Sequence, residues 1–227
     1  MKWFQRGRAG QDAGVVPLTG ISKTAGVTGT GGGPEQAPPL LTAGGPVLQH
    51  VSGDGNRVAP LTAGAGPVVL DITHHGAGHF VVDALGADLQ SQSQLVYTDG
   101  PFACRALINA DDRLVRALQV RADGPWTVEA TVVSSVLTLD EHARRPASDV
   151  LRYEGGPGIA TLRHEGAPQS DDGGYFLVDT FEADGSGFLD ELANHVGPWR
   201  GEAPLPGPCL VYARSDGPWS ISVQRLG

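Results

Sequence analysis

Short stretches in which apolar and polar residues alternate run along most of the chain. The two clearest follow the phrase Asp-Gly-Pro-Trp, which occurs at residues 123–126 and again at 216–219. After each phrase every second residue is apolar, a period that is typical of a β-strand with one buried face. The Asp-Gly pair suits a tight turn, and Pro suits the first position of a strand, where a missing N–H is tolerated. Each phrase therefore predicts a turn that leads into a half-buried strand.

The phrase belongs to a longer internal repeat. Residues 72–76 (Ile-Thr-His-His-Gly) align with 162–166 (Leu-Arg-His-Glu-Gly), and residues 80–83 (Phe-Val-Val-Asp) align with 176–179 (Phe-Leu-Val-Asp). The aligned segments are separated by insertions where Gly, Pro, Ser and Asp cluster, as expected when strands persist and loops vary. We therefore predict an internal duplication.

Further strand-like stretches, separated by turn residues, predict an all-β protein. Their spacing is that of a sandwich or barrel, and short turns join antiparallel strands, whereas parallel strands need longer crossovers. The predicted fold is two tandem antiparallel β-sandwich domains, of jelly-roll or immunoglobulin-like type. The predicted strands are 47–51, 57–61, 67–73, 79–85, 94–97, 103–108, 114–122 and 126–133, then 158–164, 175–181, 188–194, 209–215 and 219–224.

The repeat and the composition together predict four segments. Residues 1–45 are rich in Gly, Pro, Thr and Ala. Such a stretch buries too little apolar surface to offset its ordering entropy, so we expect a flexible arm. The first β-sandwich repeat is expected at 46–135 and the second at 148–227, each long enough for its own core. Residues 136–147 are expected to form a linker, with one turn of helix at 140–144.

Charge and cysteine usage narrow the class of protein. The formal net charge is −9, so we expect no nucleic-acid partner, because such binders present a basic surface. The basic N-terminus lacks the apolar run of a secretory signal, and no run of about 18 apolar residues could span a membrane. Cys104 and Cys209 do not align in the repeat, so a duplicated disulfide is not expected. These features predict a cytoplasmic protein without an integral membrane segment.

An acidic loop at Glu182–Glu191 resembles the calcium loop of an EF-hand. It has oxygen-bearing residues at alternate positions and a glycine at the sixth. Its twelfth position, which should supply a bidentate Glu, is Ala193, and the preceding residues have the pattern of a strand rather than of a helix. We interpret the loop as an acidic hairpin, with calcium binding as the alternative.

Three histidines, His74, His75 and His79, lie close together in the sequence. Strand alternation directs His74 and His75 to opposite faces, and a zinc site needs about four convergent ligands. Only His74 recurs, as His164. We therefore expect this histidine to cap hydrogen bonds of a strand or turn.

Asp83 recurs as Asp179 at the end of an apolar strand. A second carboxylate does not recur beside it, so a two-carboxylate mechanism lacks its partner. We expect cross-strand or turn hydrogen bonds at both positions.

Recurring aromatic residues could form a sugar-binding face. They are Trp126 with Trp219, and Phe102 with Trp199. All of them share the apolar phase of their strands, so burial in the core is the first interpretation.

A Gly-x-Ser-x-Gly elbow and a phosphate-binding Gly-Lys-Ser/Thr order are both missing from the sequence. We therefore assign no catalytic, cofactor-binding or metal residue and expect no enzyme.

The recurring phrases resemble those of uncharacterised actinobacterial tandem β-sandwich repeat proteins. Some of these are similar to accessory proteins of tellurium-resistance-type stress systems. The resemblance covers 46–227 and rests on turn residues, which specify fold more than activity. The expected function is a non-enzymatic structural or protein-interaction module: a tandem β-sandwich scaffold with an N-terminal docking arm and a protein partner. A ligand-binding module for carbohydrate or calcium is the alternative, and the oligomeric state is left open.

Overall fold

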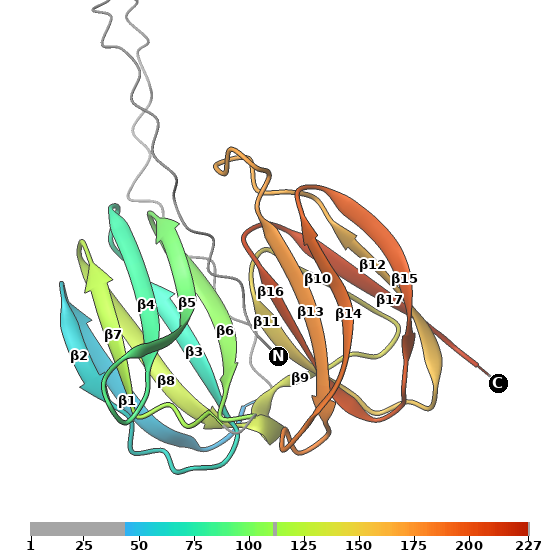
Figure 1. Ribbon diagram of the computed structural model, residues 1–227, viewed down its shortest axis with the longest axis horizontal. Helices are drawn as coiled ribbons and strands as arrows, with labels where there is room; N and C mark the ends of the chain where they lie inside the picture. The colour runs from blue at the N-terminus through green and yellow to red at the C-terminus, as the bar shows by residue number, and fades with distance from the viewer. Residues whose placement is uncertain (1–43, 111–112, 227) are drawn as a thin grey trace, which may run out of the picture. The chain divides into compact units, whose positions relative to one another are not determined.

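The structure, a computed structural model, describes residues 44–110 and 113–226, which belong to one compact unit. The predicted arm at 1–45 lies outside the described residues except for Gly44 and Gly45. The described chain is all-β, as the alternation predicts (Figure 1). Its elements are β1 (Val47–Asp54), β2 (Arg57–Pro60), β3 (Val68–His74), β4 (His79–Leu85), β5 (Ser91–Asp99), β6 (Phe102–Ile108), β7 (Ala117–Ala122), β8 (Pro125–Val132), the 3-10 helix η1 (Val133–Ser135), β9 (Leu137–Thr138), β10 (His142–Arg145), β11 (Asp149–Tyr153), β12 (Gly158–His164), β13 (Tyr175–Glu182), β14 (Phe188–Val196), β15 (Trp199–Leu205), β16 (Cys209–Ser215) and β17 (Trp219–Arg225).

The strands form four sheets, two from each half of the described chain. In the first half the sheet orders are β1-β8-β3-β6 and β2-β7-β4-β5. In the second half they are β10-β17-β12-β15 and β14-β13-β16-β11-β9. If β9 is set aside, each strand of the second half takes the place of the strand nine positions earlier in the chain. A duplicated chain would have this correspondence, and the duplication itself stays a prediction.

Both halves bury the apolar faces that the alternation predicts. In the first half the inward side chains of both sheets, such as Leu70 of β3 and Leu118 of β7, are fully buried in one core. That core also includes Val150, Leu210 and Tyr212 of the second half. The inward side chains of the second half form a separate core around Trp219. The first core therefore continues across the boundary between the halves.

The segment 136–147 differs from the expected linker. It contains β9 and β10, and β10 pairs with β17. The helical turn predicted at 140–144 is wrong, because β10 occupies most of it as a strand. This strand lies at a sheet edge, and only Ala143 of its four residues is buried. The sequence therefore shows no alternation of apolar and polar residues that would predict it.

The described chain has no helix that is long and apolar enough to cross a membrane.

Candidate functional site

The two recurring histidines cap turns, as predicted. The Nδ1 atom of His74 lies 2.8 Å from the carbonyl oxygen of Gly100, and that of His164 lies 2.9 Å from the carbonyl oxygen of Gly197. Both side chains are almost wholly buried, and each ring stacks on a phenylalanine of the neighbouring sheet. These histidines therefore serve the fold in both halves.

The other histidines of the first cluster do not converge with His74. His75 is exposed, and His79 pairs with Asp99 at 3.2 Å on the surface. Within residues 44–110 and 113–226, no group of three or more His, Cys, Asp or Glu side chains is placed to hold a metal ion. The structure thus brings no set of metal ligands together at this cluster.

The recurring aspartates form cross-strand ion pairs. Asp83 of β4 accepts a hydrogen bond from Arg121 of β7 at 2.8 Å, and Asp179 of β13 pairs with Arg214 of β16. Burial raises the pKa of Asp179, and the Arg214 charge offsets part of this rise. The predicted cross-strand hydrogen bonding is confirmed at both positions.

The recurring tryptophans are core residues. Trp126 and Trp219 are fully buried, and each indole N–H donates to a backbone carbonyl, at 2.9 and 2.8 Å. Phe102 and Trp199 are half-buried. The two tryptophans therefore do not form an exposed platform for sugar.

The acidic loop at Glu182–Glu191 is a hairpin turn between β13 and β14, as expected. The backbone N–H of Glu182 donates to the carbonyl of Gly187, which closes the turn. Asp184 accepts a hydrogen bond from the N–H of Ser186, and the Ser186 side chain holds the pKa of this carboxyl below its usual value. The carboxylate of Asp184 is thus already engaged within the loop.

Both cysteines are free and buried. Burial raises the pKa of Cys209 to about 11 and raises that of Cys104 further. The thiolate is the reactive form of cysteine, so these side chains are poor nucleophiles at neutral pH.

A row of four titratable side chains crosses the outer face of the sheet β1-β8-β3-β6. His50 of β1 lies opposite Glu129 of β8, which in turn lies opposite Asp71 of β3. Asp71 lies opposite Arg105 of β6. The row therefore takes one residue from each strand, and we call these four residues the charged row.

Exposure falls steeply along the charged row. The exposed fractions of the side chains are 51% for His50, 43% for Glu129, 11% for Asp71 and 3% for Arg105. His50 Nδ1 lies 3.1 Å from Glu129 Oε1, and Arg105 Nε lies 2.6 Å from Asp71 Oδ1. One end of the row is thus open to solvent, whereas the other is buried.

The buried end of the row joins the two halves. Arg105 Nη1 lies 3.1 Å from Asp149 Oδ1, and Arg145 Nε lies 2.5 Å from Asp149 Oδ2. The N–H of Arg105 also donates to the carbonyl of Ser148 at 3.0 Å. Burial raises the pKa of Asp71, the Arg105 charge offsets part of this rise, and nearby Asp149 and Glu129 add to it. The charged row therefore runs from an exposed His50–Glu129 pair to a buried ionic contact.

The corresponding row in the second half differs in its chemistry. The register places His142, Ser222, Thr161 and Glu202 at the equivalent positions. His142 Nδ1 meets the Ser222 hydroxyl at 3.0 Å, where the first half has a carboxylate. The fold therefore does not require the carboxylates and the arginine of the first half.

His50 has the geometry of a general base. An ionised Glu129 can only accept a hydrogen bond, so the pair places the proton on His50 Nδ1. The lone pair then lies on Nε2 of a ring that is half exposed. This arrangement can accept a proton from a molecule bound at the β1 edge.

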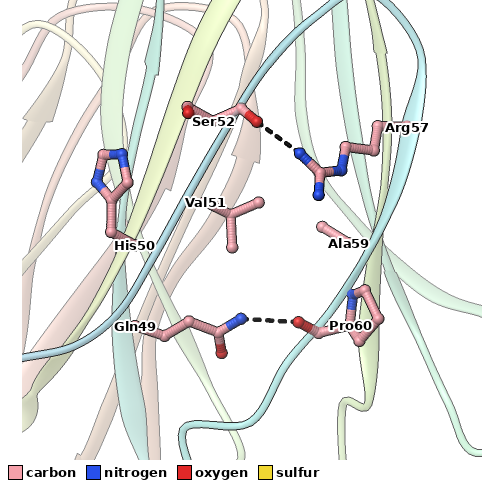
Figure 2. Close-up of a pocket in the computed structure, with 7 residues that line it drawn as sticks. All are labelled: Gln49, His50, Val51, Ser52, Arg57, Ala59 and Pro60. Carbon is pink, nitrogen blue, oxygen red and sulfur yellow. Dashed lines mark hydrogen bonds between the residues drawn. The ribbon is translucent and has the colours of Figure 1, made fainter.

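A groove of about 460 Å³ opens beside this edge, between β1 and β2. Figure 2 shows Ser52 bonded to Arg57 at one end of the groove and Gln49 bonded to Pro60 at the other. Val51 and Ala59 lie between these two pairs, whereas His50 lies to one side. The strand β1 thus presents Gln49 and Val51 to the groove and His50 to the outer face.

Sequence reasoning missed the charged row. A signal was present, because Asp71 and Arg105 are charged residues in the middle of otherwise apolar strands. Their partnership depends on strand order, since Glu129 and Asp71 are far apart in the chain and become neighbours only through the pairing of β3 with β8.

No protein-family model matches the chain. A protein of Nitrobacter winogradskyi named tRNA (guanine-N(1)-)-methyltransferase is 28% identical to it over 155 residues. The match covers 57% of this chain and 62% of that protein, so the chain spans less than two thirds of the length of this relative.

This similarity contradicts two expectations from the sequence. The chain was expected to be a non-enzymatic structural or protein-interaction module with no enzyme activity, and the relative bears the name of an enzyme. The expectation rested on the absence of known catalytic phrases. Such phrases do not reveal residues that meet only through strand pairing, such as His50 and Glu129.

Proposed function

We propose that the chain contributes to an enzymatic group transfer to a nucleobase, with His50 and Glu129 as the acid–base pair. The observation that carries the proposal is the exposed His50 ring, which Glu129 holds through Nδ1 at 3.1 Å. The name of the relative supports the reaction class, because that protein is a tRNA (guanine-N(1)-)-methyltransferase.

The chemistry at guanine requires a base. Methylation at N1 breaks the N1–H bond and forms an N1–CH3 bond, while a sulfonium donor loses its methyl group and leaves as a thioether. In our proposal the proton passes to His50 Nε2, and the Glu129 carboxylate stabilises the resulting imidazolium. A positioned general base of this kind contributes about 10²–10⁴-fold to the rate.

The charge of the chain bears on how a tRNA would be held. A net charge of −9 gives no general attraction for phosphates. The proposal therefore replaces the expectation of no nucleic-acid partner, and the net charge predicts that the chain contacts the target guanine rather than the phosphate backbone. A cytoplasmic location accords with a tRNA substrate.

The domain assignment and the resemblance are part of the same proposal. We retain two β-sandwich repeats, at 46–135 and 148–227, and a kinship with the actinobacterial tandem repeat proteins. The equivalent strand orders of the two halves support the two repeats. The segment 136–147, predicted as a linker, contributes β9 and β10 to the sheets of the second half.

Histidine footprinting tests the site. Diethyl pyrocarbonate acylates accessible imidazoles, and mass spectrometry reports the rates at His50 and His142 separately. Unmodified tRNA, added at low salt, is expected to slow acylation of His50 several-fold and to leave that of His142 unchanged, because the two rings occupy equivalent edges but only His50 faces a carboxylate. Equal rates at His50 with and without tRNA would contradict the proposal.

A further inference from the structure

One sheet of the second half buries apolar side chains on both of its faces. Leu151 of β11 and Val211 of β16 belong to the core of the second half. Their neighbours along the same strands, Val150 and Tyr212, belong to the core of the first half. Because successive side chains of a strand point to opposite faces, the outer face of the sheet β14-β13-β16-β11-β9 packs against the first half.

The first half meets this face with the strand β6, which lies at the edge of its sheet. Arg105 Nη1 of β6 lies 3.1 Å from Asp149 Oδ1 at the start of β11. The backbone N–H of Arg105 donates to the carbonyl of Ser148 at 3.0 Å. The boundary between the halves thus joins a sheet edge to the outer face of another sheet.

Each of these two surfaces has a counterpart in the other half, and both counterparts are exposed in the described part of the chain. The strand β15 corresponds to β6 and is likewise the edge of its sheet. Its residue Glu202 is exposed, whereas the equivalent residue of β6, Arg105, is buried. The strand β2 corresponds to β11, and Val58 is 50% exposed where Val150 of β11 is fully buried.

The charges on the two exposed surfaces are the reverse of those at the boundary. Glu202 of β15 takes the place of Arg105 of β6. Arg57 of β2 takes the place of Asp149 of β11. A contact of the same geometry would therefore again bring a carboxylate to a guanidinium. Reversal of one charge alone would give repulsion, so the paired reversal preserves the complementarity of the contact.

Both charged groups are accessible. Glu202 and Arg57 are exposed. Arg57 Nη1 donates to the carbonyl of Ser52 at 2.7 Å. A guanidinium has five N–H donors, so this bond holds the group in place and leaves donors for a carboxylate.

We infer that the chain associates head to tail with a second copy of itself. The β15 edge of one copy, at Glu202, packs on the outer face of the sheet β2-β7-β4-β5 of the next copy, at Arg57 and Val58. Two features favour a second copy as the occupant: the contact continues the packing of the two halves, and the reversed charges match. Each copy carries both surfaces, so the contact extends into a ring or an open chain of copies.

The contact between copies is weaker than the one between the halves. Tyr212, which lies in the first core at the boundary, has the polar Gln119 as its counterpart. The exposed surface thus offers less apolar area, and the association is reversible. The inference does not rest on the acid–base role of His50.

Sedimentation equilibrium of the full chain tests the association. At low salt, the weight-average mass is expected to rise with protein concentration and to pass the mass of two copies, because a head-to-tail contact leaves one surface of each kind open at the ends. A mass that stays at one copy would overturn the inference. A mass that levels off at two copies would show a closed dimer and would overturn the head-to-tail arrangement.

Charge reversal tests the pair that carries the inference. Glu202→Arg and Arg57→Glu each bring like charges together, and each alone is expected to lower the association constant about tenfold or more. An equimolar mixture of the two variants is expected to regain the association, because every contact between unlike copies again joins opposite charges. A mixture that associates no more than either variant alone would overturn the inference.

A matched control separates this contact from an effect of net charge. Glu141 is exposed beside β10, at the far edge of the sheet that β15 borders. Glu141→Arg makes the same change in charge as Glu202→Arg and is expected to leave the association unchanged. Circular dichroism checks that the three variants fold. An equal loss for Glu141→Arg and Glu202→Arg would overturn the inference. These readouts measure association and remain separate from any loss of methyl transfer.

Discussion

Arg105 Nη1 of β6 lies 3.1 Å from Asp149 Oδ1 at the start of β11, and this contact joins the two halves of the described chain. The same guanidinium contacts Asp71 of β3 at 2.6 Å. All three side chains are largely buried. Arg105 therefore contacts both carboxylates, and Arg145 also contacts Asp149, at 2.5 Å.

Replacement of Arg105 is expected to destabilise the protein strongly. Arg105→Met leaves Asp71 buried without the Arg105 cation, while Asp149 keeps its contact with Arg145, and breaking a buried pair in this way costs about 3–5 kcal/mol. Urea unfolding measures the loss. The control is Arg144→Ala, which removes an exposed pair with Glu165 and should cost less than about 1 kcal/mol. Similar losses in the two variants would show that Arg105 does not carry this role.

The pH dependence of stability is expected to depend on Asp71. Burial raises the pKa of this carboxyl above 3.8, so the folded state holds its proton at pH values where the unfolded state has released it. The contribution of Asp71 to the unfolding free energy is then greatest below pH 3.8, the ordinary pKa of the carboxyl. It falls as the pH rises through the folded-state pKa. Arg105 lowers this pKa, while Asp149 and Glu129 raise it.

The measurement is the difference in unfolding free energy between the wild type and Asp71→Asn across pH 3 to 7. We expect this difference to shrink as the pH rises, because only the wild type loses the proton. A difference that is constant or grows with pH would contradict the raised pKa.

A glycine in β1 provides a packing test. A Cβ atom at Gly53 would lie 2.6 Å from Cζ2 of Trp126, closer than packed atoms approach. Gly53→Ala is therefore expected to cost about 1–3 kcal/mol through overpacking. At Gly66 an added Cβ meets nothing within 4 Å, so Gly66→Ala should be neutral or slightly stabilising. Thermal unfolding compares the two variants, and equal melting temperatures would argue against tight packing at Trp126.

Much of the fold follows from local patterns in the sequence. Alternation located most strands, and turn phrases such as Asp123-Gly124-Pro125 marked where they begin. The recurrence of His74 and Asp83 correctly indicated structural hydrogen bonds. These features are set by residues that are close together in the sequence, and each of them appears in both copies of the predicted repeat.

The short strands and the charged row could not be predicted in the same way. β9 has only two residues, and its assignment depends on its pairing with β11 rather than on its own alternation. The row depends on which strands become neighbours, since His50 and Glu129 meet only because β1 pairs with β8. Strand order within a sheet is set by the packing of the whole domain, which local patterns do not encode.

Methyl transfer by the purified chain tests the central claim most directly. The assay combines unmodified tRNA, labelled S-adenosylmethionine and low salt, and it measures 1-methylguanine after digestion. The account predicts that the wild type forms the product, that His50→Gln lowers the rate about 100-fold or more, and that the matched variant His142→Gln retains it. Absence of 1-methylguanine with the wild type, or equal rates for the two variants, would contradict the account.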